Sequence, residues 1–386
     1  MQRPLKIIFD ASPLLVNKTG VAYYTERLIT HLAKEYPQDI ELVGFYYNFL
    51  GRRSVSHFPK APNIRYRPVR LLPSKVLYQL RRWGIEIPLE VLTKEKGDFV
   101  LFPNFLGWPS LFHAPAAPVI HDLTYVDLPQ YVSAKNGSDL RQFVPKQLKR
   151  SCFAVTVSNF SREGIIKNYG LEADDVIVTH IPPETPHFKK QDDLRTLLRS
   201  QGIDKPYILF IGTIEPRKNI PRLIDAYARL PETTRQKYSL VIVGRIGWNC
   251  DKEVERLKDA REQELDVRHV GYVDDKTKEA LFQGATLFVH ASEYEGFGMP
   301  VLEAMSYGVP CCISDIPVFR EVIEDAAVYF DCREIGSIAN SLEKTLRSNA
   351  LLKKLHGKSL EQAAKFNWEE AAAALYDRII KETGRA

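Results

Sequence analysis

The sequence predicts an α/β protein with two doubly wound domains, each a parallel sheet covered by helices on both faces. Its 386 residues exceed the usual size of one domain and suit two of roughly 150–200 residues. Short apolar runs alternate with helical patterns along the whole chain, which is typical of parallel strands joined by right-handed crossovers. Most of the runs are continuously apolar, as in strands that are covered on both faces.

Five strands are expected in the first half of the chain, and Tyr23 opens a helical pattern that ends at Tyr36. The apolar runs that predict these strands are residues 5–9, 40–46, 99–102, 119–121 and 153–157. The N-terminus has only a four-residue apolar run and no cleavage site, so we expect a first strand there and no signal peptide.

The second half repeats this organisation after a break near residues 181–194, which are rich in proline and charge. Its strand candidates are residues 207–211, 239–243, 267–270, 287–290 and 310–314. Residues 220–230 and 276–283 have helical patterns. We therefore expect an N-terminal domain over residues 1–185 and a C-terminal domain over residues 195–366.

Composition excludes several classes of protein. No window approaches 18 uncharged apolar residues, so no transmembrane helix is expected. The odd cysteine count and the lack of a C-x-x-C pair favour buried thiols in a reducing cytoplasm. We also expect no metal site, because the sequence has no H-x-x-x-H pair and no D-x-D pair.

The most informative segment is E-G-F-G-M-P-V-L-E, which runs from Glu295 to Glu303. It follows an apolar run and precedes a helical pattern with Pro300 near its first position, so it is a strand-to-helix loop. Backbone N–H groups at such a loop favour an anion, and two carboxylates can bind hydroxyls. The segment therefore indicates a sugar nucleotide, and the alternative is a helix start with a capping carboxylate.

Two other segments have residue types suited to such a ligand. Arg217 and Lys218 follow the strand candidate at 207–211, where positive charge can stabilise a diphosphate as a leaving group. His121 ends another strand, where ligand-facing groups of open α/β sheets belong. The alternatives are a solvated basic loop and a structural histidine.

A nicotinamide-dependent enzyme is the main competitor for a chain of this class. It would require G-x-G-x-x-G in the first strand–helix turn, but that turn has a single glycine, Gly20. Gly296 and Gly298 begin a G-x-G that continues as Met-Pro-Val-Leu. The dinucleotide fingerprint is absent, which disfavours this alternative.

Taken together, these segments resemble the retaining glycosyltransferases of family 4, which have the GT-B fold, over nearly the whole chain. The motifs are Thr19-Gly20, His121-Asp122-Leu123, residues 157–163, residues 212–219 and the E-x7-E segment 295–303. The fold implied has two Rossmann-like domains facing across a cleft, the N-terminal one for the acceptor and the C-terminal one for the nucleotide sugar. Residues 365–369 resemble the point where the final helix, 367–386, crosses back to the N-terminal domain.

The resemblance implies a role for each matching residue. Glu303 would hold the donor ribose, Glu295 would lie beside the donor sugar, and Arg217 with Lys218 would clamp the diphosphate. His121 would lie near the reacting sugar, and Gly20 would belong to a loop that closes on the phosphates. The remaining donor-binding residues implied are Gly212, Thr213, Gly296, Phe297, Gly298, Met299, Pro300, Val301 and Leu302. Thr213 departs from the family, since many relatives have Arg there, and so does Pro182 to Thr185, where relatives often have N-G-V-D.

The resemblance also implies a retaining, metal-independent hexosyl transfer without a cofactor. A front-face route is expected, and a carboxylate nucleophile is the alternative. The motifs look like those of bacterial mannosyltransferases of polysaccharide assembly. GDP-mannose is therefore the expected donor, with UDP-sugars as the alternative. A non-catalytic sugar-nucleotide sensor is a second alternative.

The acceptor side is indicated by charge. Residues 1–190 carry a net charge of +8 and residues 191–386 one of −3, and no acid occurs between Glu41 and Glu86. The basic residues in that stretch are Arg52, Arg53, Lys60, Arg65, Arg67, Arg70, Lys75, Arg81 and Arg82.

Within this stretch, residues 74–83 would form a helix with two faces. Its apolar face has Val76, Leu77, Leu80 and Trp83, and its polar face has Lys75, Gln79 and Arg82. Residues 52–83 would then dock on an anionic membrane and reach a lipid-linked saccharide, with the protein cytoplasmic and peripheral on the inner face of the plasma membrane. The alternative is a helix packed on the N-terminal core with a solvated basic face. Nucleic acid is not expected as a partner, because no binding motif accompanies the charge.

Overall fold

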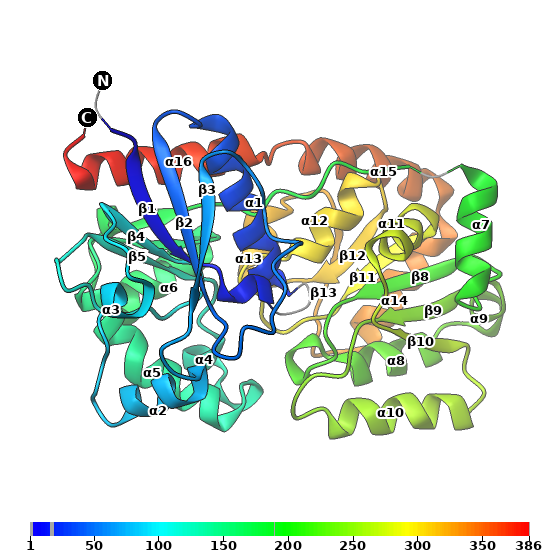
Figure 1. Cartoon of the computed structure of the whole chain (residues 1–386). Coiled ribbons are helices and arrows are strands. Elements are labelled where there is room, and N and C mark those ends of the chain that lie inside the picture. Colours follow the sequence, from blue (N-terminus) through cyan, green and yellow to red (C-terminus); the bar gives the residue numbers. More distant parts are fainter. Residues whose placement is uncertain (1–2, 16–18, 189, 386) are drawn as a thin grey trace. The chain divides into compact units, whose positions relative to one another are not determined.

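The computed structural model describes residues 3–15, 19–188 and 190–385, and these form two compact α/β units (Figure 1). The N-terminal unit comprises Met1–Val126, Lys135–Ile181 and Asn367–Ala386. The C-terminal unit comprises Pro182–Phe366 together with the short segment Asp127–Ala134. No pattern in residues 127–134 predicts that this short segment belongs to the C-terminal unit.

The N-terminal unit has a seven-stranded parallel sheet in the order β3-β2-β1-β4-β5-β6-β7. Its strands are β1 (Leu5–Asp10), β2 (Ile40–Tyr47), β3 (Ile64–Val69), β4 (Phe99–Phe102), β5 (Ala116–Ile120), β6 (Ala154–Thr156) and β7 (Val176–Val178). Its helices are α1 (Gly20–Glu35), α2 (Ser74–Arg82), α3 (Leu89–Thr93), α4 (Thr124–Asp127), α5 (Ala134–Lys149), α6 (Asn159–Tyr169) and α16 (Trp368–Thr383).

The C-terminal unit has a six-stranded parallel sheet in the order β10-β9-β8-β11-β12-β13. Its strands are β8 (Tyr207–Ile211), β9 (Ser239–Val243), β10 (Val267–Gly271), β11 (Leu287–His290), β12 (Cys311–Ser314) and β13 (Val328–Phe330). Its helices are α7 (Gln191–Ser200), α8 (Ile220–Ala228), α9 (Glu232–Lys237), α10 (Asp251–Glu262), α11 (Asp275–Gly284), α12 (Met299–Ser306), α13 (Pro317–Val322), α14 (Ile335–Arg347) and α15 (Asn349–Ala363).

The predicted fold class is confirmed, and three strands were missed. All three are edge strands: β3 and β7 close the first sheet and β13 closes one edge of the second. An edge strand needs less apolar sequence, and β3 alternates Arg65 and Arg67 with apolar residues and contains Pro68. The other two have three residues each, which is too short for a periodic signal.

The five cysteines, Cys152, Cys250, Cys311, Cys312 and Cys332, are free thiols, and all but Cys152 are buried. None of the helices in the described part of the chain combines the length and apolar character needed to span a bilayer.

The last helix belongs to the N-terminal unit, although Ala386 lies outside the described residues. α16 begins after Asn367, whose side chain accepts a hydrogen bond from the Glu370 amide at 2.8 Å. It packs against α1, and in Figure 1 these two helices are drawn in red and blue. Trp368 is 5% exposed and lies edge-on to Tyr23, with ring centroids 6.1 Å apart.

We expect Trp368→Ala to destabilise the N-terminal unit by about 3–5 kcal/mol, because it leaves a cavity between α16 and α1. The measurement is urea unfolding followed by far-ultraviolet circular dichroism. The exposed Lys381→Ala on the same helix is the control and should change stability by less than about 0.5 kcal/mol. Equal midpoints for the two variants would contradict the packing role.

Candidate active site

The candidate site of the C-terminal unit lies where β8 and β11 end. These strands are neighbours in the sheet and run parallel, so the loops that follow them leave from the same edge. The loop after β8 contains the 3-10 turn Pro216–Lys218, and the loop after β11 leads into α12. The fold thereby brings Lys218 and Glu295 together, although they are 77 residues apart in sequence.

Glu295 is the centre of a buried ion cluster. Its Oε1 accepts a hydrogen bond from Lys218 Nζ at 2.5 Å, and its Oε2 accepts one from Arg217 Nη1 at 2.6 Å. Arg217 also pairs with Glu215 at 2.7 Å. Lys218 is 5% exposed and Glu295 6% exposed, so the alternative of a solvated basic loop is wrong.

Two further donors to Glu295 were missed by the sequence analysis. His290 Nε2 lies 2.9 Å from Glu295 Oε1, and Ser292 Oγ donates to the same oxygen at 2.8 Å. A polar residue at the end of an apolar strand was the available signal for His290, the same signal that singled out His121. Among the described residues, four side chains therefore donate hydrogen bonds to the Glu295 carboxylate.

The charges of this cluster support one another. Burial raises the pKa of Glu295, but the positive charges of Arg217 and Lys218 outweigh it and hold that pKa well below its ordinary value. Burial and the neighbouring Arg217 lower the pKa of Lys218, while Glu295 opposes this shift. The arrangement keeps the carboxylate ionised and concentrates two cations beside it, which is suited to binding an anionic group.

The glycine turn of the E-x7-E segment has the geometry that only glycine permits. Gly298 has a φ of +102°, and a Cβ there would lie 2.5 Å from the Phe319 ring. It caps α12, which begins at Met299 with Pro300 in its first turn, as predicted. Gly296 and Phe297 are buried in this turn.

The structure places Val301 and Leu302 in the core rather than on a ligand-facing surface. Both side chains are fully buried, and both amides are directed to the Gly298 carbonyl, at 2.9 and 3.4 Å. The family resemblance implies donor binding for both residues, and that role stays a prediction. A helix that covers a sheet must turn one face inward, and these two residues lie on that face.

Gly212 and Thr213 follow β8 directly and lie at the start of the loop that leads to Arg217 and Lys218. Gly244, which directly follows the neighbouring β9, approaches this loop so closely that a Cβ would lie 1.9 Å from the Gly212 carbonyl oxygen. This contact fixes the backbone at the point where the loop leaves the sheet.

Glu303 lies apart from the Glu295 cluster. It pairs with Lys278 on α11 at 2.9 Å, and the two line a small pocket with Glu184, Asp275 and Tyr307. Burial lowers the pKa of Lys278, but the Glu303 carboxylate outweighs it and the pKa is raised. Lys278 was missed, since a lysine in a helical pattern has no signal of its own.

His121 and Gly20, the predicted site residues of the first domain, lie in the N-terminal unit. His121 follows β5, donates from Nε2 to the Pro103 carbonyl at 2.7 Å and lies edge-on to Tyr24 at 5.2 Å. Burial lowers its pKa. Gly20 begins α1 after the capping residue Thr19, and residues 16–18 of the predicted glycine loop lie outside the described residues.

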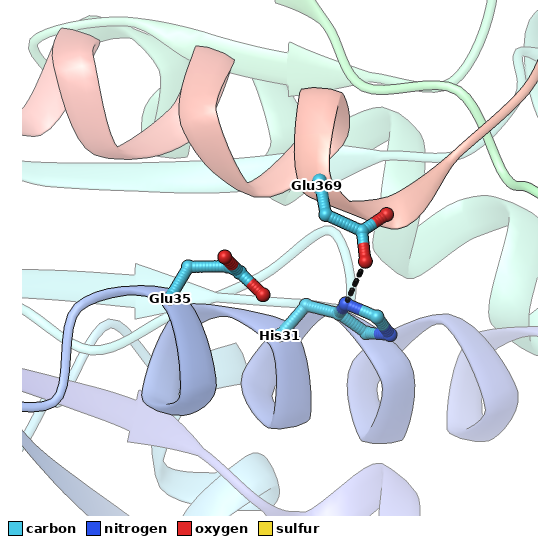
Figure 2. Close-up of side chains that lie close together, drawn as sticks. All are labelled: His31, Glu35 and Glu369. Atoms are coloured by element: carbon cyan, nitrogen blue, oxygen red, sulfur yellow. Dashed lines mark ion pairs between the residues drawn. The ribbon is translucent and has the colours of Figure 1, made fainter.

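One cluster of potential metal ligands, His31, Glu35 and Glu369, joins α1 to α16 (Figure 2). His31 Nδ1 lies 3.6 Å from Glu369 Oε1. The Lys34 ammonium lies 3.2 Å from Glu35 and 3.9 Å from Glu369, so both carboxylates already have a cation. We assign this cluster to helix packing.

In the fold, several arginines of the basic stretch, residues 52–82, are paired with carboxylates from outside it. Glu95 pairs with Arg65 and Arg67, at 2.5 and 2.7 Å, and Asp139 pairs with Arg82. Arg81 is buried beside Glu86. The five that remain exposed without an ion pair to a described residue are Arg52, Arg53, Lys60, Arg70 and Lys75.

The faces of α2 also differ from the prediction. Leu77 is buried, whereas Val76 is 41% exposed and Trp83, just beyond the helix, is 68% exposed. Arg82, assigned to the free polar face, is held by Asp139. The helix therefore packs on the unit through Leu77 and Arg81 and leaves part of its apolar surface uncovered.

We expect Glu295→Gln to lower the free energy of unfolding at pH 7 by roughly 3–5 kcal/mol, because the buried Lys218 loses its carboxylate partner and the partly buried Arg217 loses one of its two. The folded-state pKa of Glu295 is below the ordinary value of 4.5, so its contribution is present above pH 4.5 and is lost as pH falls below it. Urea unfolding at a series of pH values should therefore show the wild-type and variant curves converging below pH 4.5. The exposed Glu262→Gln is the control, and curves that stay parallel for Glu295→Gln would contradict the assignment.

The chain is similar to known glycosyltransferases. The family described as "Glycosyl transferases group 1" matches residues 195–362. The O-antigen chain mannosyltransferase B of Escherichia coli is 29% identical over 95% of this chain and 97% of its own length. The phosphatidyl-myo-inositol mannosyltransferase of Mycobacterium leprae is 30% identical over 77% of this chain and 75% of its own length.

Solved structures show the same fold. The structure of Anabaena HepE in complex with UDP and glucose is similar to this one with a TM-score of 0.70 and 16% identity, over 98% of this chain and 100% of that one. It has the GT-B fold, as this chain does. The chain belongs to the group 1 glycosyltransferases and is a glycosyltransferase.

Proposed function

We propose that this glycosyltransferase moves mannose from GDP-mannose to a glycan or lipid-linked saccharide in cell-surface polysaccharide synthesis, with retention at the anomeric carbon and without a metal. The family implies a nucleotide-sugar donor and a saccharide acceptor. The observation that carries the proposal is the buried cluster of Arg217, Lys218 and Glu295 beside the glycine turn. The mannosyltransferases among the relatives support the choice of sugar.

The chemistry proposed for the C-terminal unit is electrostatic. Lys218 and Arg217 stabilise the negative charge that develops on the departing diphosphate, and the turn from Gly296 to Pro300 positions the sugar. In a front-face route the leaving phosphate oxygen takes the proton of the acceptor hydroxyl. Glu295 is assigned to positioning rather than nucleophilic attack, because four donors already engage its carboxylate.

The remaining roles follow from the family resemblance. Glu303, held by Lys278, binds the donor ribose, and Gly212 with Thr213 lies against the diphosphate. His121 lies near the reacting sugar, and Gly20 belongs to a loop that closes on the phosphates.

Donor identity is tested by thermal unfolding with a panel of sugar nucleotides. We expect GDP-mannose to stabilise the protein more than UDP-glucose, UDP-galactose or UDP-N-acetylglucosamine, with about 2.7 kcal/mol gained at a concentration 100 times Kd. Turnover of the bound donor distinguishes an enzyme from a non-catalytic sensor. Lys218→Ala should lower turnover at least about 100-fold.

Lys205→Ala is the matched control, because this lysine also forms an ion pair within the C-terminal unit, with Asp266 at 2.6 Å, but precedes β8 rather than following it. Its turnover should stay near that of the wild type. Preference for a UDP-sugar would overturn the proposed donor, and full activity of Lys218→Ala would overturn the proposed clamp.

We also propose that the protein is cytoplasmic and binds peripherally to an anionic membrane through the N-terminal unit. Five exposed basic residues, from Arg52 to Lys75, have no ion pair to any residue that the structure describes. Exposed apolar side chains accompany them at Leu50, Leu71 and Trp83. Basic and aromatic residues on one segment suit the surface of anionic lipids.

Co-sedimentation with vesicles that contain anionic lipid tests this surface. Since each basic residue contributes about 1 kcal/mol near such a surface, replacing Arg52, Arg53 and Lys75 by Ala should weaken binding about 100-fold. The control replaces Lys344, Lys353 and Lys354, three exposed lysines of the C-terminal unit. Absence of wild-type binding at low salt, or equal losses in both triple variants, would reject the membrane surface.

A further inference from the structure

His290 is the one donor to Glu295 that comes from the apolar core. It ends β11 and is fully buried, so it cannot itself contact a ligand. Its ring lies parallel to those of Phe210 and Phe288, with centroids 5.3 and 5.9 Å away and interplanar angles of 12°. Phe319 lies edge-on at 5.8 Å. A polar side chain enclosed in this way requires a specific reason for its position.

The hydrogen bonding of the ring determines its protonation state. Nε2 lies 2.9 Å from the Glu295 carboxylate, which can only accept, so Nε2 must bear the proton. Nδ1 is buried and has no hydrogen-bond partner among the described residues, so an imidazolium would leave a buried N–H unpaired. The neutral Nε2–H tautomer satisfies both conditions.

We propose that His290 is a positioning residue, which uses its neutral Nε2–H to hold the Glu295 carboxylate in the orientation that aligns Lys218 and Arg217 for the donor. His290 and Lys218 bind the same oxygen, Oε1, so rotation of the carboxylate would break both bonds together. The stacked phenyl rings keep the imidazole from following such a rotation. The expected effect of His290 on turnover rests on the proposed function, whereas the tautomer of its ring does not.

The kinetic test compares two substitutions, with whichever sugar nucleotide the wild type turns over. His290→Phe keeps an aromatic ring but lacks the N–H, and we expect kcat to fall at least about tenfold with a smaller change in donor KM. His290→Gln retains an amide N–H near the position of Nε2 and should recover most of that loss. Phe330→Leu, a buried aromatic substitution on β13 of the same sheet, controls for a loosened core and should lower Tm without changing kcat.

The tautomer is tested separately, without activity, by ¹⁵N–¹H correlation spectra of histidine-labelled wild-type protein. We expect a protonated Nε2 and an unprotonated Nδ1 for the signal that is missing in His290→Gln. Wild-type kcat in His290→Phe, or no recovery in folded His290→Gln, would overturn the positioning role. A protonated Nδ1 would overturn the positioning role even if His290→Phe fails to fold. If the wild-type protein turns over no donor, the proposed function is refuted, and the spectrum still determines the tautomer of His290.

Discussion

The contact between Glu295 and the basic pair Arg217–Lys218 determines how the C-terminal unit is organised at its functional edge. Burying the charges of Lys218 and Glu295 is costly unless each is paired and hydrogen-bonded. Here the loop after β8 supplies the cations, and the loop after β11 supplies the anion. Neither loop can adopt its conformation alone without an uncompensated buried charge. The two loops are therefore mutually dependent, and the glycine turn and α12 follow directly from the second of them.

The interior of each sheet was predictable from sequence, and its edges were not. Strands such as β8, β9 and β11 have continuous apolar runs because helices cover both faces, and their predicted limits agree with the structure. The edge strands β3, β7 and β13 bury less and leave weaker patterns. Arg65 and Arg67 can occupy β3 because Glu95, from a distant segment, pairs with both, and Glu41 also pairs with Arg65.

The candidate site shows the same division between local and tertiary information. The residues that sequence identified, Glu295, Arg217 and Lys218, lie in loops with distinctive glycine or proline patterns. His290 and Lys278 were missed because their significance depends on a partner from another element. Val301 and Leu302, which the family resemblance implies for the donor site, have fully buried side chains, and burial of this kind is not readable from the motif alone. The free positive charge of the basic stretch was overestimated, because its partners Glu95 and Asp139 lie outside it in sequence.

The return of α16 to the N-terminal unit has a consequence for synthesis on the ribosome. The surface of α1 around Tyr23 stays uncovered until Trp368 emerges, after the whole of Pro182–Phe366 has been translated. At about 5–20 residues per second, that interval lasts roughly 10–40 s. The C-terminal unit, although made later, can complete its own core before the first unit does. The nascent chain thus exposes an aromatic surface for longer than most single domains, a period in which chaperones would act.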